Sequence, residues 1–535
     1  MSARPIVWSI AGTDSGGGAG LGADQRAADA FGVHLCPVVA AVTAQHSRAV
    51  THVEPMPPAL IEAQLQALVD DMPPRVVKTG LLGGAAQVRL VARWIDRLRD
   101  AGPVDLVVDP VQGASTGAAF ADQATLRAYR DDLLPRATVI TPNRCEAQWL
   151  LGVPSTPDTE AQPALARRLR AAGAGAACIT GGDSADASGL ALDWLASEQA
   201  DGWLALPRET SAHHHGTGCT FASSIAAALA LGFVAADAIV LAKMATTHAL
   251  RAGYAAGAGA GPVHARAGFA ADPALLPWLS WGEQPCAAPA PAPPRRRLDL
   301  YAIADSAERL QQLLEGGART LQLRIKTPDS PGASWHAGLA DAVRRSVEAC
   351  RAAGAELFVN DHWALARACG AEGVHLGQED LLALGEAGRE ALRDSGIALG
   401  ISSHSLWELC RARALAPRYI ACGPVWPTLT KAMPWRPQGL HNLSWWQRMA
   451  QRPVVAIGGI LGIDEVRAAA RCGVDGVCVV RGLGADPATT LRAFQRALAL
   501  GRADAAFTPD AALPHPTLAR DRAPAAGAMV STAGA

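Results

Sequence analysis

The chain has 535 residues, of which 50% are hydrophobic and 18% charged, and its 48 basic and 49 acidic side chains give a net charge of −1. This length exceeds what one hydrophobic core usually supports, so we expect two or more folded domains rather than a disordered chain. The balanced charge provides no basic surface for nucleic acid or an anionic membrane, which excludes both as expected partners and favours small-molecule ligands. It leaves the oligomeric state open, a homo-oligomer included.

The N-terminus and the cysteines indicate a cytoplasmic protein. Residues 1–8 lack the basic and then apolar run of a signal peptide. The eleven cysteines are scattered and include no Cys-x-x-Cys pair, so we expect reduced thiols rather than disulfides. The longest apolar stretch, 225–234, is too short before Asp237 to span a bilayer and predicts a core helix.

Residues 1–282 alternate short β-branched runs with Ala- and Leu-rich helical stretches. This alternation predicts an α/β domain in which helices cover a mostly parallel sheet. The expected buried strands are residues 6–10, 76–78, 106–109, 139–141 and 177–180.

Two glycine-rich segments of this domain are typical of anion sites. Residues 11–20 follow the first strand and leave backbone amides free to approach a ligand, although no Walker A lysine follows. Residues 215–220, His-Gly-Thr-Gly-Cys-Thr, lead into a helix whose first N–H groups and dipole suit a transferring phosphoryl group. We expect this helix start to lower the pKa of the Cys219 thiol, so that it can accept a proton from an attacking alcohol. A buried cysteine behind a glycine turn is the alternative.

The motifs of residues 1–265 resemble those of the hydroxymethylpyrimidine/phosphomethylpyrimidine kinases of the ribokinase-like superfamily. The resemblance rests on Gly12-Thr13-Asp14-Ser15, residues 16–20, Asp24, Gln45, Lys78-Thr79-Gly80, Asp109-Pro110-Val111, Thr141-Pro142-Asn143, Glu146, residues 215–220 and residues 261–264. It implies a three-layer α/β/α kinase that uses ATP and Mg²⁺. Such an enzyme phosphorylates the hydroxymethyl group of an aminopyrimidine and then the resulting monophosphate.

The same resemblance implies a role for each motif residue. The aminopyrimidine pocket would be lined by Gly12, Asp24 and Gln45. The Mg²⁺ ligands would be Asp109 and Glu146, and the nucleotide phosphates would meet Asn143, Glu146 and Lys243. The anion hole would consist of Gly216, Thr217 and Gly218, and Cys219 would stand where related sugar kinases carry an aspartate base.

This domain departs from the family pattern at two places near the phosphates. Gln112 and residues 115–117 replace a methionine and a Lys-Ser-Gly, and Thr180 replaces the lysine of a Lys-Gly-Gly. The loss of two lysines bears on nucleotide affinity and on the second phosphorylation.

Two segments without regular periodicity follow the two folded regions. Residues 283–297 are rich in Pro and Ala and end in three arginines, so we expect a semi-rigid linker there. Residues 504–535 are also rich in Ala and Pro, and we expect a disordered tail.

Residues 298–503 repeat the strand and helix alternation with a more regular spacing. The expected strands are residues 299–303, 320–324, 356–360, 373–376, 398–401, 419–422, 454–457 and 476–480. Eight strands with intervening helices in about 205 residues predict a compact (β/α)₈ TIM barrel.

Polar side chains are concentrated at the expected carboxyl ends of these strands. Gln322, Arg324 and Lys326 alternate along the second strand, so all three are expected to point the same way. Asp361 and Asp380 follow adjacent strands and predict a hard oxygen site suited to Mg²⁺. The carboxylates and cations together indicate a polyphosphate site, and solvated loop charges are the alternative.

The motifs of residues 298–485 resemble those of thiamine phosphate synthase. The resemblance implies that the pyrophosphate is held by Gln322, Arg324, Lys326, Asn360 and Lys431, and that Asp361 and Asp380 ligate Mg²⁺. The pyrimidine and the thiazole phosphate would contact Ser402, Thr428 and Thr430. The thiazole phosphate would lie against Gly458, Gly459, Val480 and Arg481, at the usual phosphate site of a barrel.

The mechanism implied by this resemblance is dissociative. Pyrophosphate leaves, a pyrimidine methyl cation forms, and the thiazole nitrogen captures it, so the protein needs cations and metal on the leaving group rather than a nucleophile. Leu461 and Arg481 depart from the family pattern near the phosphate, and a chemical role for His404 is left open.

Two alternatives to a fused kinase and synthase stay open. In the first, the barrel is a thiazole tautomerase-like relative that has lost coupling activity, but such a protein would not need both aspartates and the Thr-x-Thr-Lys of residues 428–431, which are present. In the second, the first domain is a pyridoxal-type kinase or a non-catalytic pyrimidine-binding module, an alternative that Gln45 and the missing lysines keep open.

Overall fold

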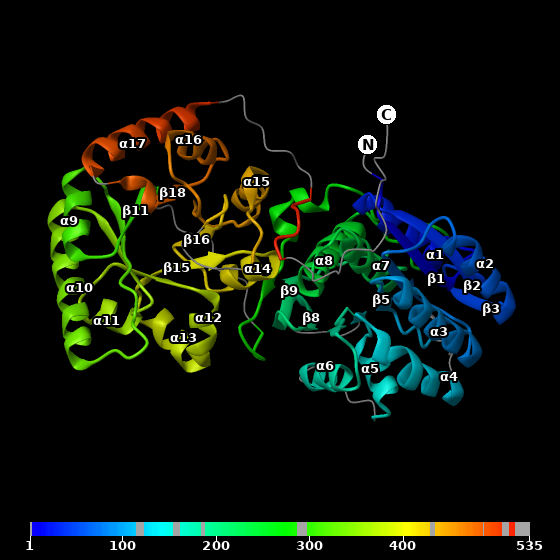
Figure 1. Ribbon diagram of the computed structural model, residues 1–535. Helices are drawn as coiled ribbons and strands as arrows, with labels where there is room; N and C mark the ends of the chain where they lie inside the picture. Colours follow the sequence, from blue (N-terminus) through cyan, green and yellow to red (C-terminus); the bar gives the residue numbers. More distant parts are fainter. Residues whose placement is uncertain are drawn as a thin grey trace, which may run out of the picture. The chain divides into compact units, whose positions relative to one another are not determined.

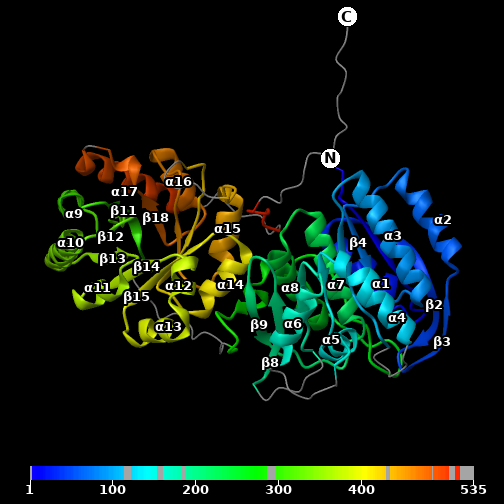
Figure 2. The same ribbon diagram turned by 60° about the horizontal axis from the view of Figure 1, so that its bottom comes forward.

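The computed structural model describes residues 3–113, 122–153, 161–182, 188–285, 297–428, 434–484, 486–504 and 513–518. The chain divides after Phe269 into two compact units, and the second unit runs to Leu518 (Figures 1 and 2). None of the helices in the described ranges has the length and apolarity that a bilayer crossing requires.

The strands of the first unit form one sheet in the order β9-β8-β7-β6-β5-β4-β1-β2-β3. All neighbouring pairs from β7 to β2 are parallel, and the pairs β2–β3, β7–β8 and β8–β9 are antiparallel. The strands are β1 (Ile6–Gly12), β2 (His34–His46), β3 (Ala49–Pro55), β4 (Val76–Thr79), β5 (Asp105–Val108), β6 (Val139–Ile140), β7 (Ala176–Ile179), β8 (Leu190–Ala196) and β9 (Asp201–Pro207).

The order of these strands distributes the helices over both faces of the sheet. The chain steps from β1 to β2 in one direction and from β4 through β7 in the other, and right-handed crossovers then place α1 opposite α3. Helix α7 packs between α1 and α8. The helices are α1 (Gly20–Phe31), α2 (Pro58–Val69), α3 (Ala85–Ala101), α4 (Gln123–Ala128), α5 (Arg144–Leu151), α6 (Ala161–Ala171), α7 (Thr217–Ala230) and α8 (Ala235–Arg251), with short turns η1 (Tyr129–Leu133) and η2 (Leu134–Arg136).

The second unit is a closed barrel of parallel strands in sequence order from β11 to β18. The strands are β11 (Asp299–Ala304), β12 (Thr320–Leu323), β13 (Glu356–Asn360), β14 (Gly373–Leu376), β15 (Ala398–Ser403), β16 (Tyr419–Cys422), β17 (Val454–Ala456) and β18 (Gly476–Val479). Figure 1 shows the helices around them: α9 (Ala307–Glu315), α10 (Ala333–Ala353), α11 (Trp363–Ala368), α12 (Gln378–Ala383), α13 (Gly385–Asp394), α14 (Leu406–Ala414), α15 (Gly439–Met449), α16 (Ile463–Arg471) and α17 (Pro487–Ala503). The predicted fold class of both domains is confirmed.

The boundary between the units differs from the predicted one at residue 282. Residues from Ala270 onward belong to the barrel unit, because Trp445 Nε1 donates a 2.8 Å hydrogen bond to the Ala270 carbonyl and Trp281 Nε1 donates one of 2.8 Å to the Arg411 carbonyl. The guanidinium groups of Arg389 and Arg411 also lie over the Trp281 ring. The predicted linker falls mostly in residues 286–296, which lie outside the described residues.

The predicted disordered tail also contains an ordered segment. Residues 513–518 belong to the barrel unit and are hydrogen-bonded to it, with Thr517 only 2% exposed. The rest of the tail beyond Asp504 lies outside the described residues.

Candidate active sites

A cavity of about 840 Å³ opens at the carboxyl ends of β1, β4, β5 and β6 and the N-terminus of α7. This is where parallel sheets whose strand order reverses bind their ligands. Most of the residues that the sequence assigned to the first domain line it, namely Gly12, Gln45, Asp109, Asn143, Glu146, Gly216, Thr217, Gly218, Cys219 and Lys243.

The start of α7 presents free backbone donors to this cavity. Gly216 has φ +86°, and a Cβ there would come within 2.2 Å of the Gly18 carbonyl oxygen, so only glycine fits. The N–H of Thr217 reaches the His214 carbonyl at 3.4 Å, and that of Thr220 reaches the Gly216 carbonyl. Within the described ranges, no group accepts a hydrogen bond from the N–H of Gly218 or Cys219. These two amides are available to an anion.

The Cys219 thiol lines the cavity, but the predicted lowering of its pKa is wrong. Burial and the carboxylates of Asp24 and Asp109 raise the pKa of Cys219 to about 12, against the opposite influence of Lys78 and of the Gly20 amide. The free-energy cost of burying a thiolate therefore outweighs its stabilisation by the helix N-terminus at this position. The ligand-free thiol is protonated at neutral pH.

Asp24 does not line the cavity, contrary to the prediction that it faces the pyrimidine. It is fully buried beneath the cavity wall, where Lys78 Nζ lies 2.9 and 3.0 Å from its two oxygens. The hydroxyls of Ser9 and Ser223 donate to it at 2.6 and 2.7 Å. Burial opposes the charge on Lys78, but Asp24, Cys219 and Asp109 together outweigh it and raise the pKa of the lysine. Lys78 itself reaches the cavity wall and Asp24 does not, so the positive end of this neutral pair lies toward the site.

Asp109 and Glu146 have donor atoms suited to Mg²⁺. Asp109 is 5% exposed, and its Oδ2 has no hydrogen-bond partner among the described residues. Burial raises the pKa of Asp109 from its ordinary value of 3.8 to about 6, with Lys78 lowering and Asp24 raising it. An unpaired buried carboxylate oxygen costs free energy unless a cation joins it. Asp109 therefore fits a metal ligand.

Asn143 and Glu146 close the N-terminus of α5 with a reciprocal capping box. The Asn143 N–H donates to Glu146 Oε2 and the Glu146 N–H donates to Asn143 Oδ1, each over 2.9 Å. Across the part of the chain that the structure describes, no group of three or more His, Cys, Asp or Glu is placed to hold a metal ion. A Mg²⁺ here would take its other ligands from phosphates and water.

The predicted phosphate contact Lys243 is engaged within the protein. Its Nζ lies 2.6 Å from Asp193 Oδ2 and 3.0 Å from the Ala191 carbonyl oxygen, while Asp193 Oδ1 accepts the Gly181 N–H. Thr180 and Gln112, which replace family residues, both line the cavity.

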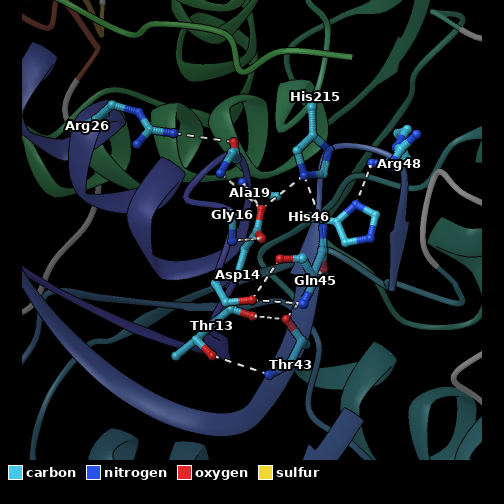
Figure 3. A network of polar contacts seen from close by, with 12 residues as sticks. Thr13, Asp14, Gly16, Ala19, Arg26, Thr43, Gln45, His46, Arg48 and His215 are labelled. Atoms are coloured by element: carbon cyan, nitrogen blue, oxygen red, sulfur yellow. Dashed lines mark hydrogen bonds and ion pairs between the residues drawn. The ribbon is translucent and has the colours of Figure 1, made fainter. Parts of the chain in front are cut away.

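Gln45 is held in a network that the sequence did not reveal (Figure 3). His215 Nε2 lies 3.0 Å from Asp14 Oδ2 and 3.1 Å from Gln45 Nε2. Burial raises the pKa of Asp14, but the His215 bond and the N–H groups of Ala19 and Gly16 lower it overall. Both Asp14 and His215 lie in the quoted motifs, and only their proximity in the fold shows what they contact.

The barrel places the predicted synthase residues at the carboxyl ends of its strands. Gln322 and Asn360 are buried at the ends of β12 and β13, Arg324 is half-buried, and Lys326 is exposed. Thr428 is described, whereas Thr430 and Lys431 lie outside the described residues.

The two predicted metal carboxylates follow neighbouring strands. The Asp361 N–H donates to the His375 carbonyl at 3.1 Å, and Asp361 has φ +65°. Asp380 Oδ2 accepts the Gly377 N–H at 2.9 Å at the start of α12. Strands β13 and β14 are paired through Asn360 and His375, so both carboxylates come from adjacent connections at one end of the barrel.

The glycines after β17 form a close turn against the connection after β16. Gly458 and Gly459 have φ +92° and +72°, and added Cβ atoms would come within 2.7 Å of Pro424 and 2.5 Å of Trp426. Within the described ranges, no group accepts their N–H hydrogens. The nearby Val480 and Arg481 are exposed, and Arg481 begins the turn η5 (Arg481–Leu483).

A chain of neutral hydrogen bonds crosses the barrel interior, and the sequence did not reveal it. Gln322 Nε2 donates to Tyr301 Oη at 3.1 Å, and the hydroxyls of Tyr301 and Tyr419 are 2.7 Å apart. His375 continues the chain, 2.8 Å from Tyr419 Oη and 3.0 Å from Ser402 Oγ. Burial lowers the pKa of His375 to about 4, helped by Arg324 and His404, so its ring is neutral. The chain links two predicted ligand contacts, Gln322 and Ser402.

Comparison with known proteins matches each unit to a family. Residues 14–264 match the family model of phosphomethylpyrimidine kinase, and residues 298–483 match that of thiamine monophosphate synthase. A probable thiamine biosynthetic bifunctional enzyme of Oryza sativa subsp. japonica is 35% identical over 472 residues, covering 85% of this chain and 81% of that protein. A thiamine biosynthetic bifunctional enzyme of Arabidopsis thaliana is 34% identical over 469 residues, covering 85% of each. A hydroxymethylpyrimidine/phosphomethylpyrimidine kinase of Synechococcus elongatus is 41% identical over 49% of this chain and 97% of its own length.

Proposed function

Since the chain belongs to the bifunctional thiamine biosynthetic enzymes, we propose which of its residues carry the two reactions. The first unit is a hydroxymethylpyrimidine/phosphomethylpyrimidine kinase and the second is a thiamine phosphate synthase. The assignment of the kinase residues depends most on one observation: the unpaired amides of Gly218 and Cys219 and the unpartnered Asp109 oxygen line the same cavity.

In the kinase, the pyrimidine lies against Gln45 and the phosphates of ATP lie between α7 and Asp109. Asp14 can only accept a hydrogen bond, so His215 Nε2 carries the hydrogen between them. A nitrogen that carries a hydrogen cannot accept one from the Gln45 NH₂ group, so the Gln45 amide is rotated by a half-turn and its oxygen faces His215 Nε2. Its NH₂ group then faces the cavity, where it donates to a ring nitrogen of the substrate. This orientation suits an aminopyrimidine.

The phosphoryl group is transferred to the hydroxymethyl oxygen while the amides of Gly218 and Cys219 stabilise its charge. Asp109 and Glu146 would hold Mg²⁺, which neutralises charge on the phosphates when bound. The substrate hydroxyl gives its proton to the sulfur of Cys219 in its thiolate form. Lys78 and the Gly20 amide favour that form.

In the synthase, the reacting groups are a pyrimidine diphosphate and a thiazole phosphate. Gln322, Arg324, Lys326, Asn360 and Lys431 bind the departing pyrophosphate, and Asp361 and Asp380 would hold Mg²⁺, which neutralises charge on the leaving group when bound. The bond from the pyrimidine methylene to the pyrophosphate oxygen breaks, and the thiazole nitrogen forms the new bond to that carbon. Ser402, Thr428 and Thr430 contact the pyrimidine and the thiazole phosphate, and Gly458, Gly459, Val480 and Arg481 hold the thiazole phosphate.

The direct test gives the purified protein hydroxymethylpyrimidine, ATP, Mg²⁺ and thiazole phosphate, and we expect release of thiamine phosphate. Cys219→Ala should stop kinase turnover and spare coupling from preformed pyrimidine diphosphate, and Asp380→Ala should do the reverse. Equal loss of both activities in either variant would contradict two independent sites.

We also propose that the enzyme works in the cytoplasm on small molecules. The cysteines support this assignment, since those in the described ranges are all free thiols, as expected in a reducing compartment.

A further inference from the structure

A short segment at the C-terminal end of the chain, Leu513–Leu518, packs on the barrel although it lies beyond the barrel fold. It follows the last helix α17 and falls outside residues 298–483, which match the synthase family model. It belongs to the barrel unit and contacts residues 435–442, which include the residues just before helix α15 and the first turn of that helix.

The contact begins with backbone pairing. Trp435 and Leu518 form an antiparallel bridge, and the Arg436 N–H donates to the Thr517 carbonyl at 2.6 Å. Backbone pairing of this kind fixes the position of both segments, since each supplies hydrogen-bond partners that the other would otherwise lack.

His515 adds three hydrogen bonds to the first turn of α15. Its N–H donates to Asn442 Oδ1 at 2.9 Å, and Asn442 Nδ2 donates to the His515 carbonyl at 3.0 Å. His515 Nε2 lies 2.9 Å from the Gln438 carbonyl oxygen, so this ring nitrogen carries the hydrogen. Gln438 and Asn442 are fully buried, which makes these bonds costly to lose.

Gln438 and Trp435 connect this contact to the end of strand β15. Gln438 Nε2 donates to the His404 carbonyl at 2.7 Å, and the Trp435 ring stacks on the His404 ring at 5.3 Å with an interplanar angle of 9°. His404 is two residues beyond Ser402, which is hydrogen-bonded to His375. The Gln438 N–H also donates to the Pro424 carbonyl at 2.7 Å, beside the glycine turn of Gly458.

We propose that Leu513–Leu518 is a positioning segment of the synthase. It holds residues 435–442 against the barrel and, through Gln438 and Trp435, fixes His404 and Pro424 next to the ligand contacts. This inference rests on the proposed synthase site and extends that site to a part of the chain beyond the barrel. Coupling therefore depends on the C-terminal extension, and the kinase does not.

The test compares two shortened chains with the full protein. A chain that ends at Asp504 lacks the segment, and a chain that ends at Leu518 keeps it and serves as the matched control. We expect the first to lose about tenfold in kcat/KM for coupling, mainly through a higher KM for its substrates, because small displacements at a site are costly in rate. We expect the second to match the full chain and both to keep full kinase activity.

Two point variants decide the question even if the shorter chain folds poorly. His515→Ala removes the bond to the Gln438 carbonyl, and His515→Gln keeps an N–H donor there. We expect a several-fold fall in coupling for the first and recovery in the second, with both variants folded at the assay temperature. Full coupling by the folded 504-residue chain, or equal coupling by all His515 variants, would overturn the inference. A full-length protein that never couples would instead refute the proposed synthase function.

Discussion

The two active sites rest on polar networks of opposite character. Below the kinase cavity, a charged pair, Asp24 and Lys78, is fully buried with two serine hydroxyls as its further partners. Inside the barrel, the network from Gln322 to Ser402 contains only neutral groups. A buried ion pair sets a field for phosphate chemistry but is costly to break, whereas a neutral chain orients groups at little electrostatic cost.

One titratable group in each site makes an opposite contribution to stability in acid. The pKa of Asp109 is raised, so the folded state binds this proton before the unfolded chain does, and the Asp109 contribution to stability grows as pH falls. The pKa of His375 is lowered, so the unfolded chain binds this proton first, and the His375 contribution to the stability of the second unit falls with pH. Hydrogen exchange read by mass spectrometry can follow each unit separately.

The largest effect is expected from breaking the buried ion pair. Lys78→Met leaves the Asp24 carboxylate unpaired and should cost the first unit about 3–5 kcal/mol in free energy of unfolding. Asp24→Asn should cost a similar amount. The double variant should be more stable than either single one, because it leaves no buried charge. Additive losses in the double variant, measured by denaturant unfolding, would contradict this pairing.

Mild acid should destabilise the barrel by nearly as much. The pKa of His375 falls from its ordinary value of 6.5 to about 4 on folding. At 1.36 kcal/mol per unit, the barrel should lose about 3 kcal/mol as pH drops from 6.5 to 4. His375→Gln removes the titrating group and serves as the control. An equal pH slope in both proteins would show that His375 is not the cause.

Replacing Asp109 should stabilise the kinase unit while it removes kinase activity. The pKa of Asp109 is about 6 instead of 3.8. Above pH 6 the charged Asp109 therefore lowers the free energy of unfolding of the first unit by up to ~3 kcal/mol, and Asp109→Asn removes this cost. The measurement is denaturant unfolding at pH 7.5 in metal-free buffer. Added Mg²⁺ with nucleotide should stabilise the original protein and not the variant. A destabilised Asp109→Asn protein would contradict an unpartnered carboxylate.

The smallest expected effect is the change in kinase activity for each pH unit. With the pKa of Cys219 at about 12, the thiolate fraction grows tenfold with each pH unit. Kinase kcat/KM should therefore rise about tenfold from pH 7 to pH 8, with coupling from preformed diphosphate as the control. A flat profile would mean that Cys219 only contacts the substrate.

Sequence patterns predicted both folds because strand and helix alternation is a local property. The eight barrel strands and β1, β4, β5, β6 and β7 fall where short β-branched runs occur. The prediction omitted β2, which contains Pro37 and alternating small residues, although it carries Gln45 at its end. The motifs likewise indicated the cavity residues.

Contacts between distant residues were what the sequence left unresolved. The partner of Asp24 is Lys78, 54 positions later, and it decides that the carboxylate faces inward rather than toward substrate. The rise in the pKa of Cys219 similarly depends on burial by packed elements. A helix start can be predicted from sequence, and so can the dipole that lowers the pKa of a thiol there. The burial that raises this pKa depends on the packing of distant elements and cannot be predicted in the same way.

The interaction of Trp281 with Arg389 and Arg411 has a practical consequence for cutting the protein in two. A gene fragment that begins at the first barrel strand would lose an aromatic cover that belongs to the barrel, leaving Arg389 without the Trp281 ring and Arg411 with the Trp407 ring on one side. A synthase half prepared for separate expression should therefore start at Ala270, and a kinase half should stop at Phe269.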